Sequence, residues 1–149
     1  MGNMYGKGPK GTATKKHSAV VRLRGECEAS GYRSDCQRDH ALQAAHINSR
    51  RYNSTRTLLN NAFCLCASCH KFFTDFPREF SRFISTTWAQ DIYENLTDLS
   101  IRSTMFKMKD ADWREENDRL NKMAELDPDQ ARMVEYAWLC EKYGWPEEY

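Results

Sequence analysis

The feature that most constrains this chain is a pair of cysteines separated by two residues, Cys66 and Cys69. A pair with this spacing forms a tight turn that directs two thiolates at one metal ion, with sulfur–zinc distances of about 2.3 Å. Two further cysteines, Cys27 and Cys36, lie upstream and can complete the tetrahedron through a wider loop, at a modest cost in chain entropy. We therefore predict a structural zinc site that joins two segments far apart in the sequence.

The other two cysteines, Cys64 and Cys140, are weaker candidates for metal ligands. Cys64 is a possible substitute, but it shares strand parity with Cys66 and is expected to point into the core. Cys140 is expected to be a small buried hydrophobe. Residues 1–16 lack the apolar segment of a secretory signal, so metal binding is a better interpretation of the clustered cysteines than a disulfide framework.

The charge of the chain is divided unevenly between its two halves. Residues 1–72 carry 12 Lys and Arg against 4 Asp and Glu, whereas residues 73–149 carry 10 against 17. The basic first half favours a polyanion, DNA in particular, as the partner. The acidic second half would be repelled by phosphates, so we expect it to face away from nucleic acid, where it could bind a protein partner or mediate self-association.

The composition is that of a soluble globular protein, with 40% hydrophobic and 29% charged residues. No apolar run approaches the roughly 18 residues needed to span a bilayer. We therefore expect a cytoplasmic protein that does not associate with membranes.

The first part of the chain is predicted to contain a tail and a helix. Residues 1–13 hold four of the seven glycines and are expected to form a flexible basic tail. Residues 14–24 combine Val and Leu with Lys and Arg, which predicts a short basic helix that ends at Gly25.

The middle of the chain is predicted to form two strands and a helix. Residues 41–47 and 62–65 are expected to pair as a hairpin around a polar loop. A short helix should follow over residues 69–73 and end before Pro77. The fold class is therefore α+β.

The second half reads as helical. Phe80 and Phe83 are spaced i, i+3, and Trp88, Ile92 and Leu96 are spaced i, i+4, as in amphipathic helices. Another helix is expected over residues 110–126. In the final helix, Asp127 is the expected N-cap, Pro128 the first helical residue and Gly144 the end.

Near the cysteine pair lie side chains suited to phosphodiester hydrolysis, which needs a base, a cation and groups that hold phosphates. His46 can deprotonate water, since a neutral imidazole titrates near working pH. His70 can bind a second metal ion through a ring nitrogen, and the amide of Asn61 can fix the loop and the orientation of His46. The loop between the strands carries three arginines placed to hold a phosphate: Arg50, Arg51 and Arg56.

These residues resemble the motif of the HNH nucleases, also called ββα-metal or His-Me finger nucleases. The resemblance rests on Ala45-His46-Ile47, then Asn61, then Leu65-Cys66-x2-Cys69-His70. It implies a hairpin and helix that grip a catalytic Mg²⁺ or Mn²⁺ ion and are braced by a four-cysteine zinc site. It also implies that His46 is the general base, Asn61 the family's asparagine and His70 a metal ligand.

The resemblance predicts the division of the chain and its activity. An HNH nuclease domain is expected over residues 14–100, followed by a helical C-terminal extension over residues 101–149. The stretches 42–46 and 72–77 are similar to phage HNH proteins, including recombination proteins of the NinG type. The implied activity is a DNA endonuclease that leaves 5′-phosphate and 3′-hydroxyl ends, in a phage protein expressed in a bacterial host.

One position departs from the family pattern. Most members carry Asp or His directly before the base as a second metal ligand, whereas this chain has Ala45. The ligand could instead be Asp39, His40 or Gln43, or water and substrate oxygens. Ala45 also supports an alternative function, a zinc-braced DNA-binding module with a degenerate nuclease site. His17 lies among lysines and is expected at the surface or against a phosphate.

Overall fold

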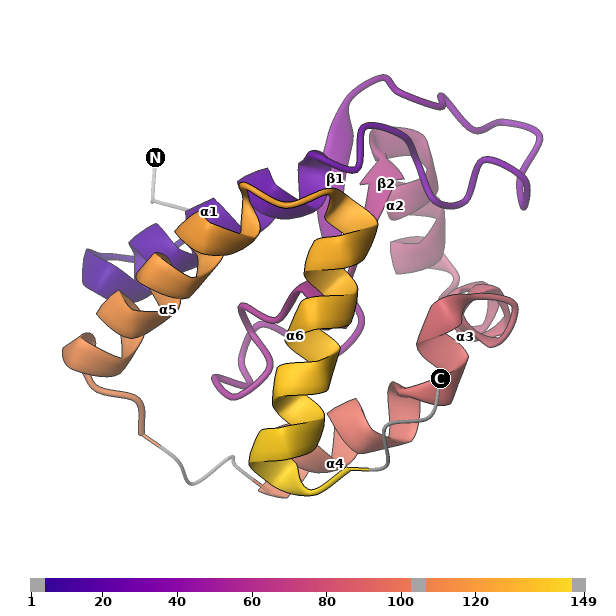
Figure 1. Cartoon of the computed structure of the whole chain (residues 1–149). Helices are drawn as coiled ribbons and strands as arrows, with labels where there is room; N and C mark the ends of the chain where they lie inside the picture. Colours follow the sequence, from indigo (N-terminus) through magenta and orange to yellow (C-terminus); the bar gives the residue numbers. More distant parts are fainter. Residues whose placement is uncertain (1–4, 103–106, 146–149) are drawn as a thin grey trace.

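The computed structural model describes residues 5–102 and 107–145, which form an α+β fold that is mostly helical with a small two-stranded sheet (Figure 1). The remaining parts of the predicted tail and C-terminal extension, residues 1–4, 103–106 and 146–149, lie outside the described residues. The elements, in chain order, are α1 (Gly8–Arg22), β1 (Leu42–His46), η1 (Leu59–Asn61), β2 (Ala62–Cys66), α2 (Ala67–Asp75), α3 (Pro77–Ser85), η2 (Trp88–Asp91), α4 (Tyr93–Arg102), α5 (Asp110–Met123) and α6 (Pro128–Tyr143).

The two strands form an antiparallel pair whose register runs from Leu42 opposite Cys66 to His46 opposite Ala62. All five residues of β2 are buried. α2 follows β2 directly, with Cys66 as its N-cap residue. The predicted hairpin and short helix are therefore confirmed, each within two residues of its expected ends.

The first helix begins earlier than the sequence suggested. Residues 8–13 belong to α1, so the predicted flexible tail is wrong for this segment. Pro9 lies in the first turn, where its fixed φ suits a helix and its missing N–H costs nothing. Gly11 marks a close approach of the chain: a Cβ there would collide with the backbone carbonyl of Gly6. This glycine permits packing and does not signal flexibility.

The helices of the second half follow the expected pattern, except that α5 ends three residues before the expected residue 126 and one segment is divided. The segment containing Trp88, Ile92 and Leu96 is divided between the 3-10 turn η2 and the helix α4, and Ile92 lies between them. α6 begins as expected, because the Asp127 side chain accepts a hydrogen bond from the backbone N–H of Gln130 at 3.4 Å. It ends at Tyr143, and the next residue, Gly144, caps it with a left-handed φ of 68°.

The acidic helix α5 packs along the basic helix α1, and the two run side by side in Figure 1. The Lys10 ammonium lies 5.8 Å from the centre of the Trp113 ring. The Asn117 side chain donates a hydrogen bond to the Pro9 carbonyl at 3.3 Å. Part of the acidic half is therefore packed against the basic half of the same molecule.

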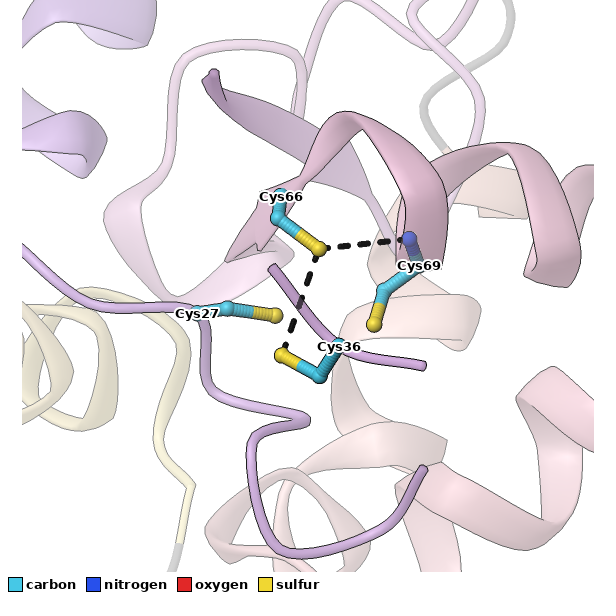
Figure 2. A group of neighbouring side chains, drawn as sticks. All are labelled: Cys27, Cys36, Cys66 and Cys69. Carbon is cyan, nitrogen blue, oxygen red and sulfur yellow. Dashed lines mark hydrogen bonds between the residues drawn. The ribbon is translucent and has the colours of Figure 1, made fainter. Parts of the chain in front are cut away.

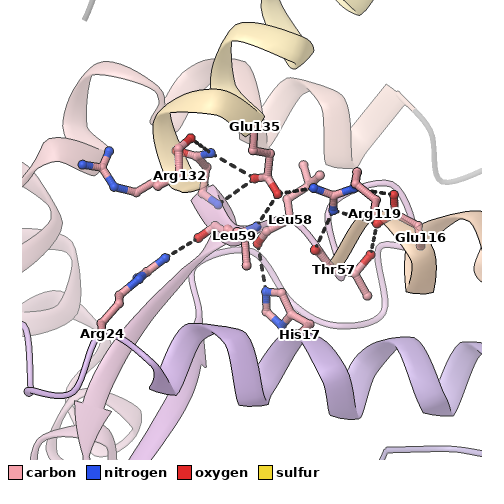
Figure 3. Close-up of polar contacts among 10 residues, drawn as sticks. His17, Arg24, Thr57, Leu58, Leu59, Glu116, Arg119, Arg132 and Glu135 are labelled. Atoms are coloured by element: carbon pink, nitrogen blue, oxygen red, sulfur yellow. Dashed lines mark hydrogen bonds and ion pairs between the residues drawn. The ribbon is translucent and has the colours of Figure 1, made fainter. Parts of the chain in front are cut away.

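A buried polar network joins α5 and α6 to the segment before β2 (Figure 3). Arg119 of α5 forms ion pairs with Glu135 of α6 at 2.6 Å and with Glu116 at 2.8 Å. Glu135, which is 1% exposed, accepts hydrogen bonds from the backbone N–H groups of Leu59 at 2.8 Å and Asn60 at 2.9 Å. This network holds the C-terminal helices against the hairpin.

Among the described residues, no helix is long and apolar enough to cross a membrane.

Candidate functional site

Four cysteines from three parts of the chain come together in a single cluster (Figure 2). Cys27 and Cys36 lie on the segment between α1 and β1, Cys66 ends β2, and Cys69 lies in the first turn of α2. All four sulfur atoms lie within 4.8 Å of one another. The Cys36 and Cys66 sulfurs are 4.0 Å apart, close to the edge of about 3.8 Å expected for a ZnS₄ tetrahedron. The cluster can therefore hold a metal ion such as zinc.

Backbone N–H groups point at the sulfur atoms, as thiolate ligands require. The Cys66 sulfur accepts from the backbone N–H groups of Cys69 and Gln37, both at 3.4 Å. The Cys36 sulfur accepts from the N–H of Arg38 at 3.3 Å. Because Cys66 caps the N-terminus of α2, the helix dipole also favours negative charge there.

The pKa values of the cysteines reflect two opposing effects. Burial raises the pKa of Cys66, but hydrogen bonds from the backbone of Cys69 and Gln37 outweigh it and bring the pKa down to about 7. Burial dominates at Cys69 and raises its pKa to about 11, although Arg33 opposes that rise. Arg33 donates to the Cys69 sulfur at 3.4 Å and stacks on the Phe72 ring at 4.2 Å. This positive charge beside the sulfurs was not evident from the sequence, because Arg33 and Cys69 lie 36 positions apart.

The segment that carries Cys27 is attached to β2 by Glu28. The Glu28 N–H donates to the Cys64 carbonyl at 2.8 Å, and the Glu28 carboxylate accepts from the Cys64 N–H at 2.7 Å. Cys64 and Cys140 are buried outside the cluster. The predicted set of four cysteines is therefore the set that the structure brings together.

His46 ends β1 and contacts the loop that follows it. Its Nε2 lies 2.9 Å from the Arg56 carbonyl oxygen. Because a carbonyl only accepts, Nε2 carries the proton and Nδ1 keeps a lone pair. Burial, reinforced by the charges of Arg50, Arg56 and His70, lowers the pKa of His46 to about 4, although the hydrogen bond to the Arg56 carbonyl opposes the change. The ring is therefore neutral near pH 7.

Asn61 ties together both ends of the loop, as the sequence suggested. Its Oδ1 accepts from the Asn48 N–H at 2.9 Å, and its Nδ2 donates to the carbonyls of Asn48 and Thr55, each at 3.0 Å. Its backbone carbonyl accepts from the Ile47 N–H at 2.8 Å. Asn61 therefore shapes the loop, and the loop in turn places the Arg56 carbonyl on His46.

His70 lies in the first half of α2 and pairs with β1. Its Nδ1 is 2.7 Å from Oε1 of Gln43. An amide oxygen only accepts, so Nδ1 carries the proton and Nε2 keeps the lone pair that a metal ion needs. Burial, followed by the charge of Arg50, lowers the pKa of His70. Asp39 and His40, the other possible substitutes for a ligand at position 45, are exposed.

The three loop arginines differ in their environment. Arg50 and Arg51 are exposed, and Arg50 is close enough to lower the pKa of both His46 and His70. Arg51 donates to the Tyr52 hydroxyl at 2.6 Å and stacks on that ring at 4.7 Å.

Arg56 is more enclosed than the other two. Its guanidinium donates to Thr14 Oγ1 at 2.7 Å, to the Arg50 carbonyl at 2.8 Å and to the Tyr5 carbonyl at 3.2 Å. Arg56 therefore fastens the loop to α1, a role that the sequence analysis did not foresee.

His17 is fully buried, with 0% exposure, so the prediction of a surface residue is wrong. It shares the inner face of α1 with Ala13, Val20 and Val21. Its ring centre lies 5.0 Å from that of His46. The spacing of these small and apolar residues was the available signal, and the neighbouring lysines obscured it.

Ala45, at the position where the HNH resemblance implies a metal ligand, is 3% exposed and packs in the core around the cysteine cluster.

Comparison with protein-family models, with curated proteins and with solved structures found no significant match to this chain. Its function must therefore be argued from the chemistry of the side chains themselves.

Proposed function

We propose that this protein is a metal-dependent DNA endonuclease of the HNH type. The observation that carries the proposal is that two neutral histidines close enough to affect one another have their lone pairs on different nitrogens, Nδ1 of His46 and Nε2 of His70. Arg50 influences the pKa of both rings. A base, a metal ligand and a phosphate-binding cation thus occupy one region of the hairpin and α2, which is the combination that phosphodiester hydrolysis requires.

In the proposed reaction His46 is the general base. Its Nδ1 lone pair accepts a proton from the attacking water, and the Arg56 carbonyl holds the ring through Nε2 as the charge develops. Arg50 and Arg51 bind the phosphate oxygens of the strand. His70 would hold a Mg²⁺ or Mn²⁺ ion through Nε2. Such an ion would stabilise the negative charge on the phosphate and on the leaving oxygen.

The four cysteines are proposed to hold a structural zinc ion. Four sulfur ligands leave no open coordination position for substrate, which is typical of a structural site. The zinc would join the segment before β1 to the start of α2, and so position His70 relative to the hairpin. Because four thiolates exceed the charge of one Zn²⁺ ion, Arg33 would offset part of the negative charge at Cys69.

A cleavage panel tests the proposal. Purified protein is incubated with Mg²⁺, Mn²⁺, Zn²⁺ or EDTA and with plasmid, linear, nicked or branched DNA, or RNA. We expect cleavage of at least one DNA form with Mg²⁺ or Mn²⁺ and none in EDTA. Arg50→Ala should weaken DNA binding, with a smaller dependence on salt, whereas Arg82→Ala, which removes an exposed arginine on α3, should not. Absence of cleavage under every condition would contradict the proposal.

A second candidate function is DNA binding without cleavage, and Ala45 is the observation that favours it. A buried methyl group cannot coordinate an ion, so His70 would lack the neighbouring protein ligand that the motif usually provides. Titration with Mn²⁺ distinguishes the two functions. Paramagnetic broadening of the His70 resonances supports a catalytic ion, whereas no broadening combined with salt-sensitive DNA binding supports the binding module.

A further inference from the structure

α1 contacts the proposed base directly, although it lies outside the motif that identifies the site. His17 extends from α1 toward the segment before β2 (Figure 3). Its ring centre is 5.0 Å from that of His46, and the ring planes are tilted by 40°. One turn earlier, Thr14 accepts the hydrogen bond from Arg56, whose carbonyl holds His46. α1 therefore supports His46 at two points.

The hydrogen bonding of His17 shows which ring nitrogen donates to its surroundings. Nε2 is 2.9 Å from the Leu58 carbonyl oxygen and carries the proton. Nδ1 is buried and has no hydrogen-bond partner within the described residues. An unpaired buried nitrogen of this kind is unfavourable, because burial removes its hydrogen bond to water. The bond to the Leu58 carbonyl gives Nε2 a structural role, but it accounts neither for the buried Nδ1 nor for the contact of the ring with His46.

We propose that His17 is a positioning residue for His46. Its buried ring, anchored to the Leu58 carbonyl, is the platform that keeps Nε2 of His46 on the Arg56 carbonyl and leaves Nδ1 as the proton acceptor. This inference rests on the proposed nuclease function.

A neutral platform also suits a base that becomes positively charged. The groups that face His46 are His17 from α1, Arg50 and Arg56 from the loop, and His70 from α2. Both arginines oppose a positive charge on His46, and a cationic residue at position 17 would add to that repulsion. Burial, followed by the charge of His46, lowers the pKa of His17 well below its ordinary value, so its neutral ring adds no repulsion.

Two substitutions separate the ring of His17 from its hydrogen bond. His17→Gln keeps an amide donor for the Leu58 carbonyl and removes the ring, whereas His17→Phe keeps a ring and removes the donor. We expect His17→Gln to lower kcat for plasmid nicking by about tenfold to a hundredfold with KM unchanged. It should also shift the ring ¹⁵N resonances of His46. His17→Phe should retain more of kcat but unfold at a lower temperature.

The matched control is Ala19→Gln, at an exposed position of the same helix, which should match the wild type in kcat and in the His46 spectrum. A wild-type kcat and His46 spectrum in folded His17→Gln would overturn the inference while leaving the nuclease function intact. If His17→Gln does not fold, His17→Phe provides the test, because it keeps a ring at this position. The inference is then overturned if the His46 resonances of His17→Phe show the proton on Nδ1 instead of Nε2. If the wild type cleaves nothing, the nuclease function fails, and the ¹⁵N spectra still report whether His17 sets the tautomer of His46.

Discussion

At the scale of single residues, hydrogen bonds to carbonyl oxygens determine which nitrogen of each histidine is available for chemistry. His17 and His46 each have Nε2 on a backbone carbonyl at 2.9 Å, and His70 has Nδ1 on the Gln43 amide oxygen at 2.7 Å. The lone pair therefore lies on Nδ1 in the first two rings and on Nε2 in the third. The different roles proposed for His46 and His70 rest on these contacts and not on residue type.

The lowered pKa of His46 predicts how stability depends on pH. Burial, followed by the nearby positive groups, lowers its pKa from 6.5 to about 4 in the folded protein. Between about pH 4 and pH 6.5, His46 binds a proton in the unfolded chain but not in the folded chain. The free energy of unfolding should therefore fall as pH decreases from about 6.5 to about 4. His46→Gln should flatten this dependence. Urea unfolding across that range, with zinc content checked at each pH, makes the comparison, and equal slopes in the two proteins would contradict it.

Residues of the site were predictable where the signal was local in sequence. The spacing of Asn61, the cysteine pair and His70 predicted residues that lie on the hairpin and α2, and the structure brings all four predicted cysteines together. His17 was not predictable as a partner of His46, because the contact joins positions 29 residues apart and depends on how α1 packs. Arg56 was predicted to contact a phosphate, because its hydrogen bond to Thr14 of α1 also joins positions far apart in the sequence. Local spacing carries no signal for such a contact.

At the scale of elements, strong local signals predicted the ends of helices and strands well. Asp127, Pro128 and Gly144 delimit α6 as expected, and both strands lie where the segments on either side of the polar loop were expected to pair. The start of α1 was not predicted, because glycine-rich sequence is typical of flexible tails. Packing against α5 overrides that local preference.

The cysteine cluster predicts a dependence of the hairpin on zinc. Cys27→Ser should lose the bound zinc and lower the unfolding temperature, because the ion contributes binding free energy to the folded state alone. Cys64→Ala removes a buried sulfur outside the cluster and should keep one zinc per chain. Elemental analysis and thermal unfolding measure both properties. Full zinc content in Cys27→Ser would show that this cysteine is not a ligand.

Gly11 provides a test of the early start of α1. Gly to Ala in a helix interior normally stabilises by about 1 kcal/mol. Here the added Cβ would meet the Gly6 carbonyl, so Gly11→Ala should destabilise the protein by about 1–3 kcal/mol. Gly31→Ala, where a Cβ would have nothing within 4 Å, serves as the control. Urea unfolding compares the two, and a stabilised Gly11→Ala would mean that this part of the helix is not packed as described.

At the scale of the whole molecule, the uneven charge of the chain is partly resolved within the fold itself. The acidic helix α5 lies along the basic helix α1, and Arg119 and Glu135 link α5 to α6 across the segment before β2. Net charges of the two halves predicted a nucleic-acid partner, but they carry no information on how helices far apart in sequence pack together. The exposed Arg50 and Arg51 are the loop arginines that remain accessible to a phosphate.

Glu135→Gln tests whether the buried network holds the two parts together. The substitution would leave Arg119 with Glu116 as its remaining ion-pair partner and would turn an amide donor toward the Leu59 or Asn60 N–H. We expect a loss of about 1–3 kcal/mol in the free energy of unfolding, because a buried N–H group loses its acceptor. Glu141→Gln, at an exposed position of α6, should change it by less than about 0.5 kcal/mol. Equal effects in urea unfolding would rule out a stabilising role for the network.

The most direct test of the central claim is the rate at which His46→Ala nicks supercoiled plasmid. If His46 is the base of a metal-dependent nuclease, the wild type should nick plasmid in Mn²⁺ or Mg²⁺. The variant should then lose about 10²–10⁴-fold in rate while retaining its zinc and its circular dichroism spectrum. Nicking by folded His46→Ala at the wild-type rate would contradict the claim.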